Sequence, residues 1–413
     1  MRAHHHHHAR AARKLLLYSH DTYGLGHLRR NLRIANHLLG VDDTLQIVLV
    51  SGSPVSGHFP LPRGLTLVKL PSVRKVGAEQ YQPLDPRLGI GLIRRARTAI
   101  MSDVVRRLRP DVLLVDHSPA GMHNELLGVF DTVRHHCPDT RIVLGLRDIL
   151  DDPAAVIRTW GAQDLYRVIA EAYDQVVVYG SREVFDVGTG YRLPEPVRQR
   201  LVYCGYLRPA RGGEAARGEA PEIESPYLLA TAGGGGDGAA ALAGAIDAGS
   251  LLDARVLAVA GPLMDDADYA GLERAASRSG SVRLVRFHPH LQAAMAGARA
   301  VVTMGGYNSL SEAVAMGVPT VVVPRREPRL EQTIRARLFA ERGLVRVAEL
   351  GADLGTRIAA AVADGSTRPV SPLDFGGLER LSDVLLSPAL PQHGAAGRAP
   401  GAEETDFADR LPA

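Results

Sequence analysis

The chain has 413 residues, of which 46% are hydrophobic and 23% charged, and its formal net charge at pH 7 is +3. Its length and apolar content allow two domains with substantial cores. The small net charge, without a dense basic tract, argues against nucleic acid as a partner. Two cysteines, Cys137 and Cys204, are too few for a disulfide framework or a CxxC metal site, so we expect a cytoplasmic protein.

The N-terminus, residues 1–13, carries five consecutive histidines, His4 to His8, in a basic context. We interpret it as a disordered leader, either native or a vector-derived tag, although such a tract could also bind metal. The apolar run at 14–18 is too short for a signal peptide. No stretch reaches the roughly 18 apolar residues that a membrane-spanning helix requires.

Short apolar runs bounded by turn residues alternate with helical patterns in the first half of the chain. These runs lie at 15–19, 45–52, 65–71, 111–117, 141–148 and 175–180. Continuous hydrophobicity is typical of strands covered on both faces, and intervening helices are typical of parallel βαβ units. The pattern predicts a Rossmann-like N-terminal domain over residues 14–207.

A second series of apolar runs follows in the second half. These runs lie at 227–233, 254–261, 282–288, 298–306 and 318–324. Residues 208–226, rich in Gly, Ala, Pro and charge, have the composition of a linker. We predict a second Rossmann-like domain over 227–388 and a disordered tail over 389–413. The predicted fold class is α/β, with two parallel-sheet domains facing each other across a cleft that receives ligands at the strand exits.

A histidine follows the first predicted strand, in the segment HDTYGLGHLRR. His27 opens a helix there, and Asp116 follows a later strand of the same sheet. Because parallel strands end at one edge, the Asp116 carboxylate can reach Nδ1 of His27. It would fix the tautomer and raise the basicity, so that Nε2 could take a proton from an acceptor hydroxyl. His27 could instead cap the helix or belong to the core, and His20 differs from it only in lying outside the helix mouth.

Other residues at these strand exits are candidates for the acceptor side of the cleft. They are Gly26, Arg29, Arg147 and Asp148. Arg147 and Asp148 could instead form an ion pair that ties the strand end to a neighbour. The arginine-rich amphipathic segment at 90–110 fits either peripheral contact with an anionic membrane or a crossover helix with a solvated face.

Two glycine-rich turns follow strands in the second half. In TMGGYNSLSE, Gly305 and Gly306 let a ligand approach the backbone, and the amides of Asn308 and Ser309 open a helix that suits a diphosphate. Glu312, one turn later, can accept hydrogen bonds from paired sugar hydroxyls. These residues could instead serve only as helix caps. The other turn contains Gly233, Gly234 and Gly235.

From Gly261 to Gln332 the sequence resembles the donor half of GT-B glycosyltransferases. The likeness is to family 28 enzymes such as the peptidoglycan N-acetylglucosaminyltransferase, and more distantly to UDP-glycosyltransferases. In MGGYNSLSE, the resemblance implies that Gly306, Asn308 and Ser309 face the diphosphate and that Glu312 binds the ribose.

The resemblance extends to the segments on either side of that motif. PRREPRLEQ implies donor-sugar contacts by Glu331 and Gln332, and RFHPHL implies that Phe287 and His288 bracket the base. Met304 is a departure, because UDP-glycosyltransferases usually carry a phosphate-contacting His there. That contact would be absent or supplied by another group; the two arginines considered for it are Arg325 and Arg326.

In the first half, GLGHLRR resembles the acceptor-domain loop of family 28, and VDH resembles the strand end that holds the Asp of a His-Asp dyad in UDP-glycosyltransferases. The likeness covers roughly residues 14–386 and is closest to a bacterial group of predicted family 28-like transferases. It supports the assignment of His27 as base and Asp116 as its orienting carboxylate.

The sequence therefore predicts a glycosyltransferase that moves a sugar from a UDP- or dTDP-linked donor to a hydroxyl of a small-molecule or lipid-linked acceptor. One base implies inversion at the anomeric carbon. The sequence contains no HExxH motif, no DxD in a convincing loop and no cysteine cluster, so no metal or other cofactor is expected. Two alternatives stay open: a nucleotide-sugar 2-epimerase on the same fold, and a non-catalytic sugar-nucleotide-binding subunit. We expect a cytoplasmic location, with or without peripheral membrane contact.

Overall fold

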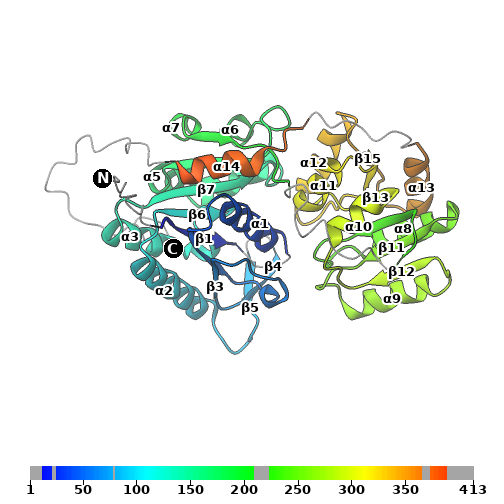
Figure 1. The fold of residues 1–413 in the computed structure, drawn as a ribbon, viewed down its shortest axis with the longest axis horizontal. Coiled ribbons are helices and arrows are strands. Elements are labelled where there is room, and N and C mark those ends of the chain that lie inside the picture. Colours follow the sequence, from blue (N-terminus) through cyan, green and yellow to red (C-terminus); the bar gives the residue numbers. More distant parts are fainter. Residues whose placement is uncertain (1–11, 21–24, 78–79, 209–222, 365–372, 388–413) are drawn as a thin grey trace, which may run out of the picture.

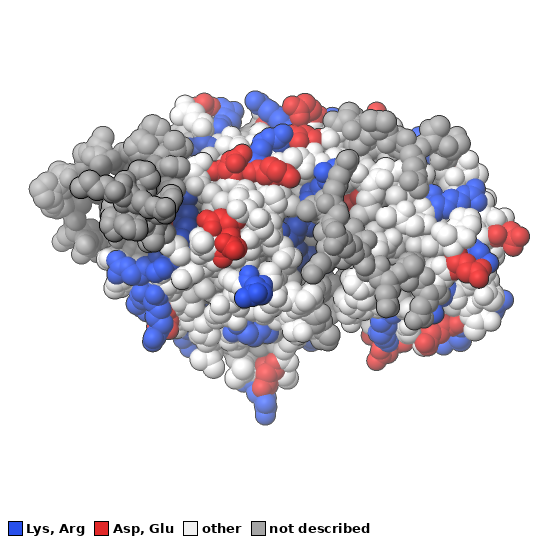
Figure 2. Space-filling view, in the orientation of Figure 1, with Lys and Arg blue, Asp and Glu red and all other residues white. Residues whose placement is uncertain are grey.

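The computed structural model describes residues 12–20, 25–77, 80–208, 223–364 and 373–387. They form two α/β domains that lie side by side (Figure 1). Most of the expected leader, the middle of the expected linker and the expected tail from 389 onward lie outside the described residues. On the face drawn in Figure 2, acidic and basic side chains are interspersed over both domains.

The N-terminal domain contains a seven-stranded parallel sheet in the order β3-β2-β1-β6-β7-β8-β9. Its strands are β1 (Lys14–Ser19), β2 (Gln46–Ser51), β3 (Leu65–Lys69), β6 (Val112–Asp116), β7 (Arg141–Arg147), β8 (Gln175–Tyr179) and β9 (Leu201–Tyr203). Each apolar run of the first half contains a strand, as predicted. The short β9 and the antiparallel hairpin of β4 (Val73–Gly77) and β5 (Gln80–Pro83) were not predicted. Strands that are buried only in part, such as β5 and β9, have too few apolar residues in a row to be recognised in the sequence.

Helices cover both faces of this sheet (Figure 1). They are α1 (Gly26–Val41), α2 (Ile90–Leu108), α3 (Leu127–His136), α4 (Pro153–Ala162), α5 (Leu165–Ala172), α6 (Val187–Gly190) and α7 (Glu195–Arg198), with single 3₁₀ turns at Ser56–His58 and Met122–Asn124. In α1, Leu28, Leu32, Ala35 and Leu39 are buried and form the face that packs on the core. In α2, Arg97 is also buried rather than solvated, because its guanidinium pairs with the buried carboxylate of Glu125 at 2.6 Å.

The C-terminal domain contains a six-stranded parallel sheet in the order β12-β11-β10-β13-β14-β15. Its strands are β10 (Tyr227–Thr231), β11 (Arg255–Val259), β12 (Val282–Val285), β13 (Ala300–Thr303), β14 (Thr320–Val322) and β15 (Arg346–Val347). Its helices are α8 (Ala239–Leu251), α9 (Asp266–Ala276), α10 (Leu291–Gly297), α11 (Tyr307–Ala315), α12 (Glu331–Ala340) and α13 (Leu354–Asp364). The predicted second Rossmann-like sheet is therefore present.

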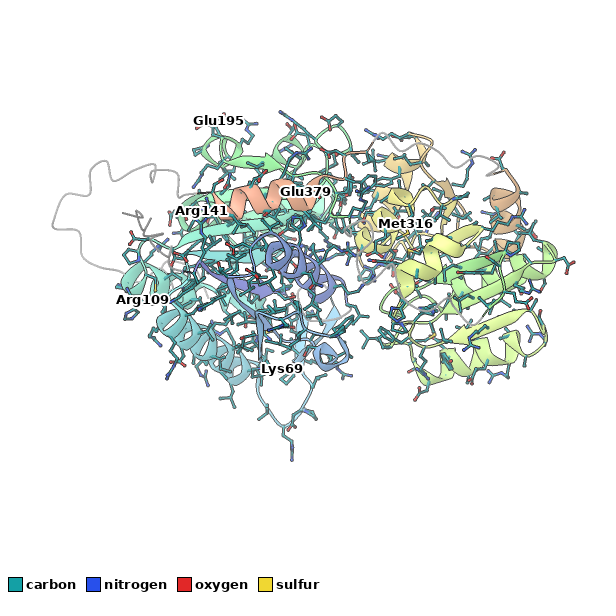
Figure 3. All side chains as sticks on the ribbon, in the orientation of Figure 1. Lys69, Arg109, Arg141, Glu195, Met316 and Glu379 are labelled. Carbon is teal, nitrogen blue, oxygen red and sulfur yellow. The ribbon has the colours of Figure 1, made fainter. Side chains whose placement is uncertain are left out.

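The last helix, α14 (Gly377–Leu386), corrects the predicted domain boundary at residue 388, because it packs on the N-terminal domain. Its leucines Leu381 and Leu385 join the apolar core that includes α1. Arg141, labelled beside α14 in Figure 3, donates to the carbonyl oxygen of Leu385 at 3.1 Å. The apolar face of a helix shows that it must pack, but not against which domain.

Candidate active site

A cavity of about 910 Å³ lies between the two domains, where the carboxyl ends of both sheets face each other. Twelve of the predicted site residues line it: Gly26, His27, Arg29, Arg147, Gly233, Gly234, Gly235, Gly306, Asn308, Ser309, Glu331 and Gln332. Six others do not: Asp116, Asp148, Phe287, His288, Gly305 and Glu312. The volume lies within the range of small-molecule sites.

The predicted contact between His27 and Asp116 is present. His27 begins α1 directly after the first strand exit, and its Nδ1 lies 2.7 Å from Oδ2 of Asp116 at the end of β6. Arg30, one turn along α1, donates from Nε to Oδ1 at 3.0 Å and from Nη2 to Oδ2 at 2.7 Å. Asn31 Nδ2 donates to Oδ2 at 3.3 Å. The Asp116 carboxylate, although buried, is therefore surrounded by donors.

The charge state of this pair follows from burial and from Arg30. Burial raises the pKa of Asp116, but Arg30 and His27 outweigh it, so the pKa of this carboxyl is well below its usual range. Nη2 of Arg30 also lies 2.8 Å from Nδ1 of His27, but its protons are accepted by both oxygens of Asp116, at 2.8 and 2.7 Å. With the ionised carboxylate 2.7 Å from Nδ1, we assign the proton to that nitrogen, which leaves Nε2 of His27 as an acceptor. This tautomer suits a general base.

The expected rise in the basicity of His27 is not the net result. Asp116 raises the pKa of His27, but desolvation by burial is larger, and Arg30 and Arg147 act in the same direction as burial. The pKa of His27 is consequently lowered. The imidazole is neutral at pH 7 and can accept a proton, although it is a weaker base than the sequence suggested.

Two further histidines lie beside His27, and the structure distinguishes their roles. The ring centroids of His117 and His20 lie 5.0 and 6.0 Å from that of His27. His20 is held by two tyrosines: Nδ1 lies 3.2 Å from the Tyr18 hydroxyl and Nε2 lies 3.4 Å from the Tyr81 hydroxyl. Nε2 of His27, in contrast, makes no hydrogen bond to the described residues, so His27 is the better placed base.

His117 was missed by sequence reasoning, although it follows Asp116 directly in the VDH motif that had been singled out. Its backbone φ is +75°, a conformation that only the tertiary structure reveals. Burial and the nearby positive charge of Arg147 hold the pKa of His117 well below its ordinary value. Its Nδ1 is buried without a hydrogen-bond partner among the described residues.

The C-terminal wall of the cavity contains the two glycine-rich turns. Gly233, Gly235 and Gly305 all have positive φ, at +64°, +98° and +83°. A Cβ on Gly235 would lie 2.5 Å from the carbonyl oxygen of Ala260, so this turn requires glycine. Asn308, in the first turn of α11, donates across the cleft to the carbonyl oxygen of Gly26 at 2.9 Å.

Glu331 and Gln332, at the start of α12, line the cavity, and their contact with a donor sugar stays a prediction. Arg325 donates to Oε1 of Glu331 at 2.7 Å and, through its backbone N–H, to Oε1 of Gln332 at 3.3 Å. Oε2 of Glu331 is buried without a hydrogen-bond partner among the described residues. That oxygen is available to a ligand group that donates a hydrogen bond.

Glu312 is fully buried, and its carboxylate is bound by arginines of the other domain. Nη2 of Arg29 lies 3.2 Å from both oxygens, and Arg33 also donates to Oε1. Burial raises the pKa of Glu312, but the two arginines outweigh it and the net shift is downward. A role in ribose binding stays a prediction, and it requires Glu312 to exchange these arginines for hydroxyls.

Asp148 is not at the acceptor side of the cavity, which corrects that assignment. It also does not pair with Arg147. Its buried carboxylate receives Arg335 of α12, with Nη2 at 2.8 Å from Oδ1, and the Tyr206 hydroxyl at 3.2 Å from Oδ2. Asp148 therefore ties the two domains together. The alternative ion pair between Arg147 and Asp148 is therefore not formed, and the partner of Asp148 is Arg335, 187 residues away.

The two residues expected to bracket the base lie outside the cavity lining. Phe287 is 42% exposed, and its ring meets that of Phe59 edge-on with centroids 6.2 Å apart. Nδ1 of His288 accepts from the backbone N–H of His290 at 3.2 Å. Their contact with a base stays a prediction.

The arrangement of two Rossmann-like domains around one interdomain cavity defines the GT-B class of glycosyltransferase folds. A UDP-glucosyltransferase from Polygonum tinctorium superposes with a TM-score of 0.58 and 16% identity, over 91% of this chain and 99% of that one. MurG of Acinetobacter baumannii superposes with a TM-score of 0.55 and 12% identity, over 90% of this chain and 98% of that one. A transferase from Siraitia grosvenorii in complex with UDP superposes with a TM-score of 0.54 and 15% identity, over 90% of this chain and 99% of that one.

Within this class, residues 257–371 match the glycosyltransferase family 28 C-terminal domain. The search of curated proteins found no match. The chain thus has the GT-B fold, and the domain match together with that fold supports a glycosyltransferase that resembles family 28.

Proposed function

We propose that the protein transfers a sugar from a nucleotide-sugar to an acceptor hydroxyl, with His27 as the general base. One observation supports this most directly. His27, with Nδ1 held by Asp116, and the glycine-rich turns at Gly233 and Gly306 line opposite walls of a single cavity. A base and an anion-binding wall that share one cavity are what direct sugar transfer requires.

In the proposed reaction, Nε2 of His27 removes the proton from the acceptor hydroxyl while that oxygen attacks the anomeric carbon. The bond from this carbon to the diphosphate oxygen breaks, and its electron pair leaves with the nucleoside diphosphate. Asp116 stabilises the imidazolium that forms, because its carboxylate already accepts from Nδ1. A single displacement inverts the anomeric configuration.

The donor would lie against the C-terminal wall. Amides at the start of α11, around Asn308 and Ser309, suit the diphosphate. Glu331 and Gln332 suit the hydroxyls of the sugar, and Glu312 the ribose. We propose UDP as the first nucleotide to test, because the Siraitia grosvenorii transferase was solved with UDP.

We further propose that the reaction needs no metal. Among the described residues, no group of three or more His, Cys, Asp or Glu could hold a metal ion. Helix amides and arginine could neutralise the leaving diphosphate in its place.

No helix in the described part of the chain is long and apolar enough to cross a membrane. Peripheral contact through the arginine-rich face of α2 stays a proposal, testable by flotation with anionic liposomes.

Thermal shift with UDP-, dTDP- and GDP-sugars tests the donor site. A ligand at 100 times its Kd adds about 2.7 kcal/mol of stability. Glu312→Gln should reduce the shift from the nucleotide that binds. His27→Ala should leave that shift intact and abolish transfer to an acceptor, with the exposed His135→Ala as the matched control. Absence of a shift with every nucleotide would contradict the proposed function.

A further inference from the structure

We propose that Arg147, from the N-terminal domain, binds the leaving diphosphate across the cleft. This inference rests on the proposed function. It assigns to Arg147 the phosphate contact that Met304 cannot make, because a thioether has no hydrogen-bond donor.

Arg147 is a cation that lines the cavity, and no described carboxylate forms an ion pair with its guanidinium. It lies at the end of β7, and its side chain makes no hydrogen bond or ion pair with the residues that the structure describes. Its Nε is buried and has no hydrogen-bond partner in the described part of the chain. An unpaired guanidinium in such a place is unfavourable, so an anionic ligand group would stabilise it.

The other arginines that line the cavity each have a carboxylate nearby in the described chain. Arg29 contacts Glu312, Arg30 contacts Asp116, Arg325 contacts Asp237 and Glu331, and Arg329 lies 3.9 Å from Asp151. Arg326 pairs with Glu349 on the surface and does not line the cavity. The two arginines that the sequence offered for the phosphate, Arg325 and Arg326, are thus already paired.

The local potential at Arg147 also favours an anion. Burial lowers the pKa of Arg147 to about 10, and the positive charges of Arg30, Arg335 and Arg329 act in the same direction. Among the groups with the largest effects on this pKa, Glu331 alone raises it. At pH 7 the guanidinium is still charged. A diphosphate would compensate several of these positive charges together.

The surroundings of Arg147 indicate the donor diphosphate rather than an anionic acceptor group. Its electrostatic neighbours include Glu331 and Arg335 of α12 in the C-terminal domain. Nη1 of Arg335 donates to the carbonyl oxygen of Gly305 at 3.0 Å, in the turn assigned to the diphosphate. The guanidinium therefore lies near the donor wall, although its backbone belongs to the acceptor domain.

This placement gives Arg147 a function in the reaction itself. When the bond between the anomeric carbon and the diphosphate breaks, negative charge develops on the leaving oxygen. A positioned guanidinium stabilises that charge more strongly in the transition state than in the ground state. Because Arg147 and the glycine-rich turn belong to different domains, the contact forms only when the domains are closed.

The test measures binding of UDP, UMP and uridine by calorimetry in the absence of an acceptor, with the dTDP and GDP series in parallel. Arg147→Met should weaken binding of the nucleoside diphosphate by about 10- to 100-fold and leave nucleoside binding unchanged. Arg147→Lys should restore part of the affinity, because a point charge remains. Arg326→Met is the matched control and should have no effect. In the transfer reaction, kcat should fall in Arg147→Met even at saturating donor.

Each other outcome overturns the inference in a distinguishable way. Unchanged diphosphate affinity in Arg147→Met, or an effect on the acceptor KM alone, would reject the role of Arg147 and leave the proposed function intact. Equal loss of uridine and UDP binding would indicate a general distortion and also reject it. If the wild-type protein binds no nucleoside diphosphate of any series, both the inference and the proposed function fail.

Discussion

Replacement of Asp116 by Asn should affect both stability and activity, because this carboxylate neutralises Arg30 and orients His27. Both the Asp116 and the Arg30 side chains are 1% exposed. Removing one partner of a buried ion pair destabilises by about 3–5 kcal/mol. An Asn oxygen still accepts one hydrogen bond, and Arg30 keeps its position 5.6 Å from the ring centroid of Tyr179. We therefore expect Asp116→Asn to lower the free energy of unfolding by about 3 kcal/mol, the lower end of this range.

Urea denaturation followed by the fluorescence of Trp160 measures this loss. Trp160 is the single tryptophan of the chain and is buried in the N-terminal domain. With an m-value of about 1–3 kcal/mol/M, the midpoint should fall by about 1–3 M. Asp116→Asn should also reduce kcat by about 10²- to 10⁴-fold, because an Asn amide can donate to Nδ1 of His27 and select the wrong tautomer.

Two controls make this prediction specific. Asp103→Asn removes an exposed partner of Arg107 and should change stability by less than about 1 kcal/mol. The double variant Arg30→Met with Asp116→Asn should recover part of the stability, because no unpaired charge remains. The reasoning is wrong if Asp116→Asn unfolds at the same urea concentration as Asp103→Asn, or if the double variant is no more stable than Asp116→Asn.

The other predictions concern the domain interface, pH and the glycine-rich turn. Asp148→Asn leaves Arg335 buried and unpaired, and it should lower the free energy of unfolding by about 3–5 kcal/mol in urea titrations, with partial recovery in a double variant that also carries Arg335→Met. The pKa values of His27 and His117 are lowered in the folded protein, so the unfolded chain binds more protons than the folded one below about pH 6.5. The free energy of unfolding should therefore be highest above that pH. On acidification it should fall by up to about 1.4 kcal/mol per pH unit for each histidine. His117→Gln should reduce that slope, and an unchanged slope would argue against the burial of neutral His117. Gly235→Ala forces a side chain into a positive-φ position beside a backbone carbonyl, and it should weaken nucleotide binding in calorimetry by at least about 1 kcal/mol, whereas full retention of affinity would place the nucleotide elsewhere.

The amino-acid sequence by itself determined the features that depend on local pattern. Continuous apolar runs specify buried parallel strands, and glycine-rich turns at their exits specify where a backbone comes close to a ligand. The contact between His27 and Asp116 was also predictable over 89 residues, because all parallel strands of one sheet end at the same edge.

Only the tertiary structure decided which charged groups meet. Arg33 and Glu312 are 279 residues apart, and Asp148 and Arg335 are 187 apart, in different domains. No local periodicity encodes such pairs, because they depend on how one domain rests on the other. For the same reason, the sequence could nominate Arg147 as a cleft residue but could not show that its guanidinium, unlike those of its neighbours, lacks a carboxylate partner in the described chain.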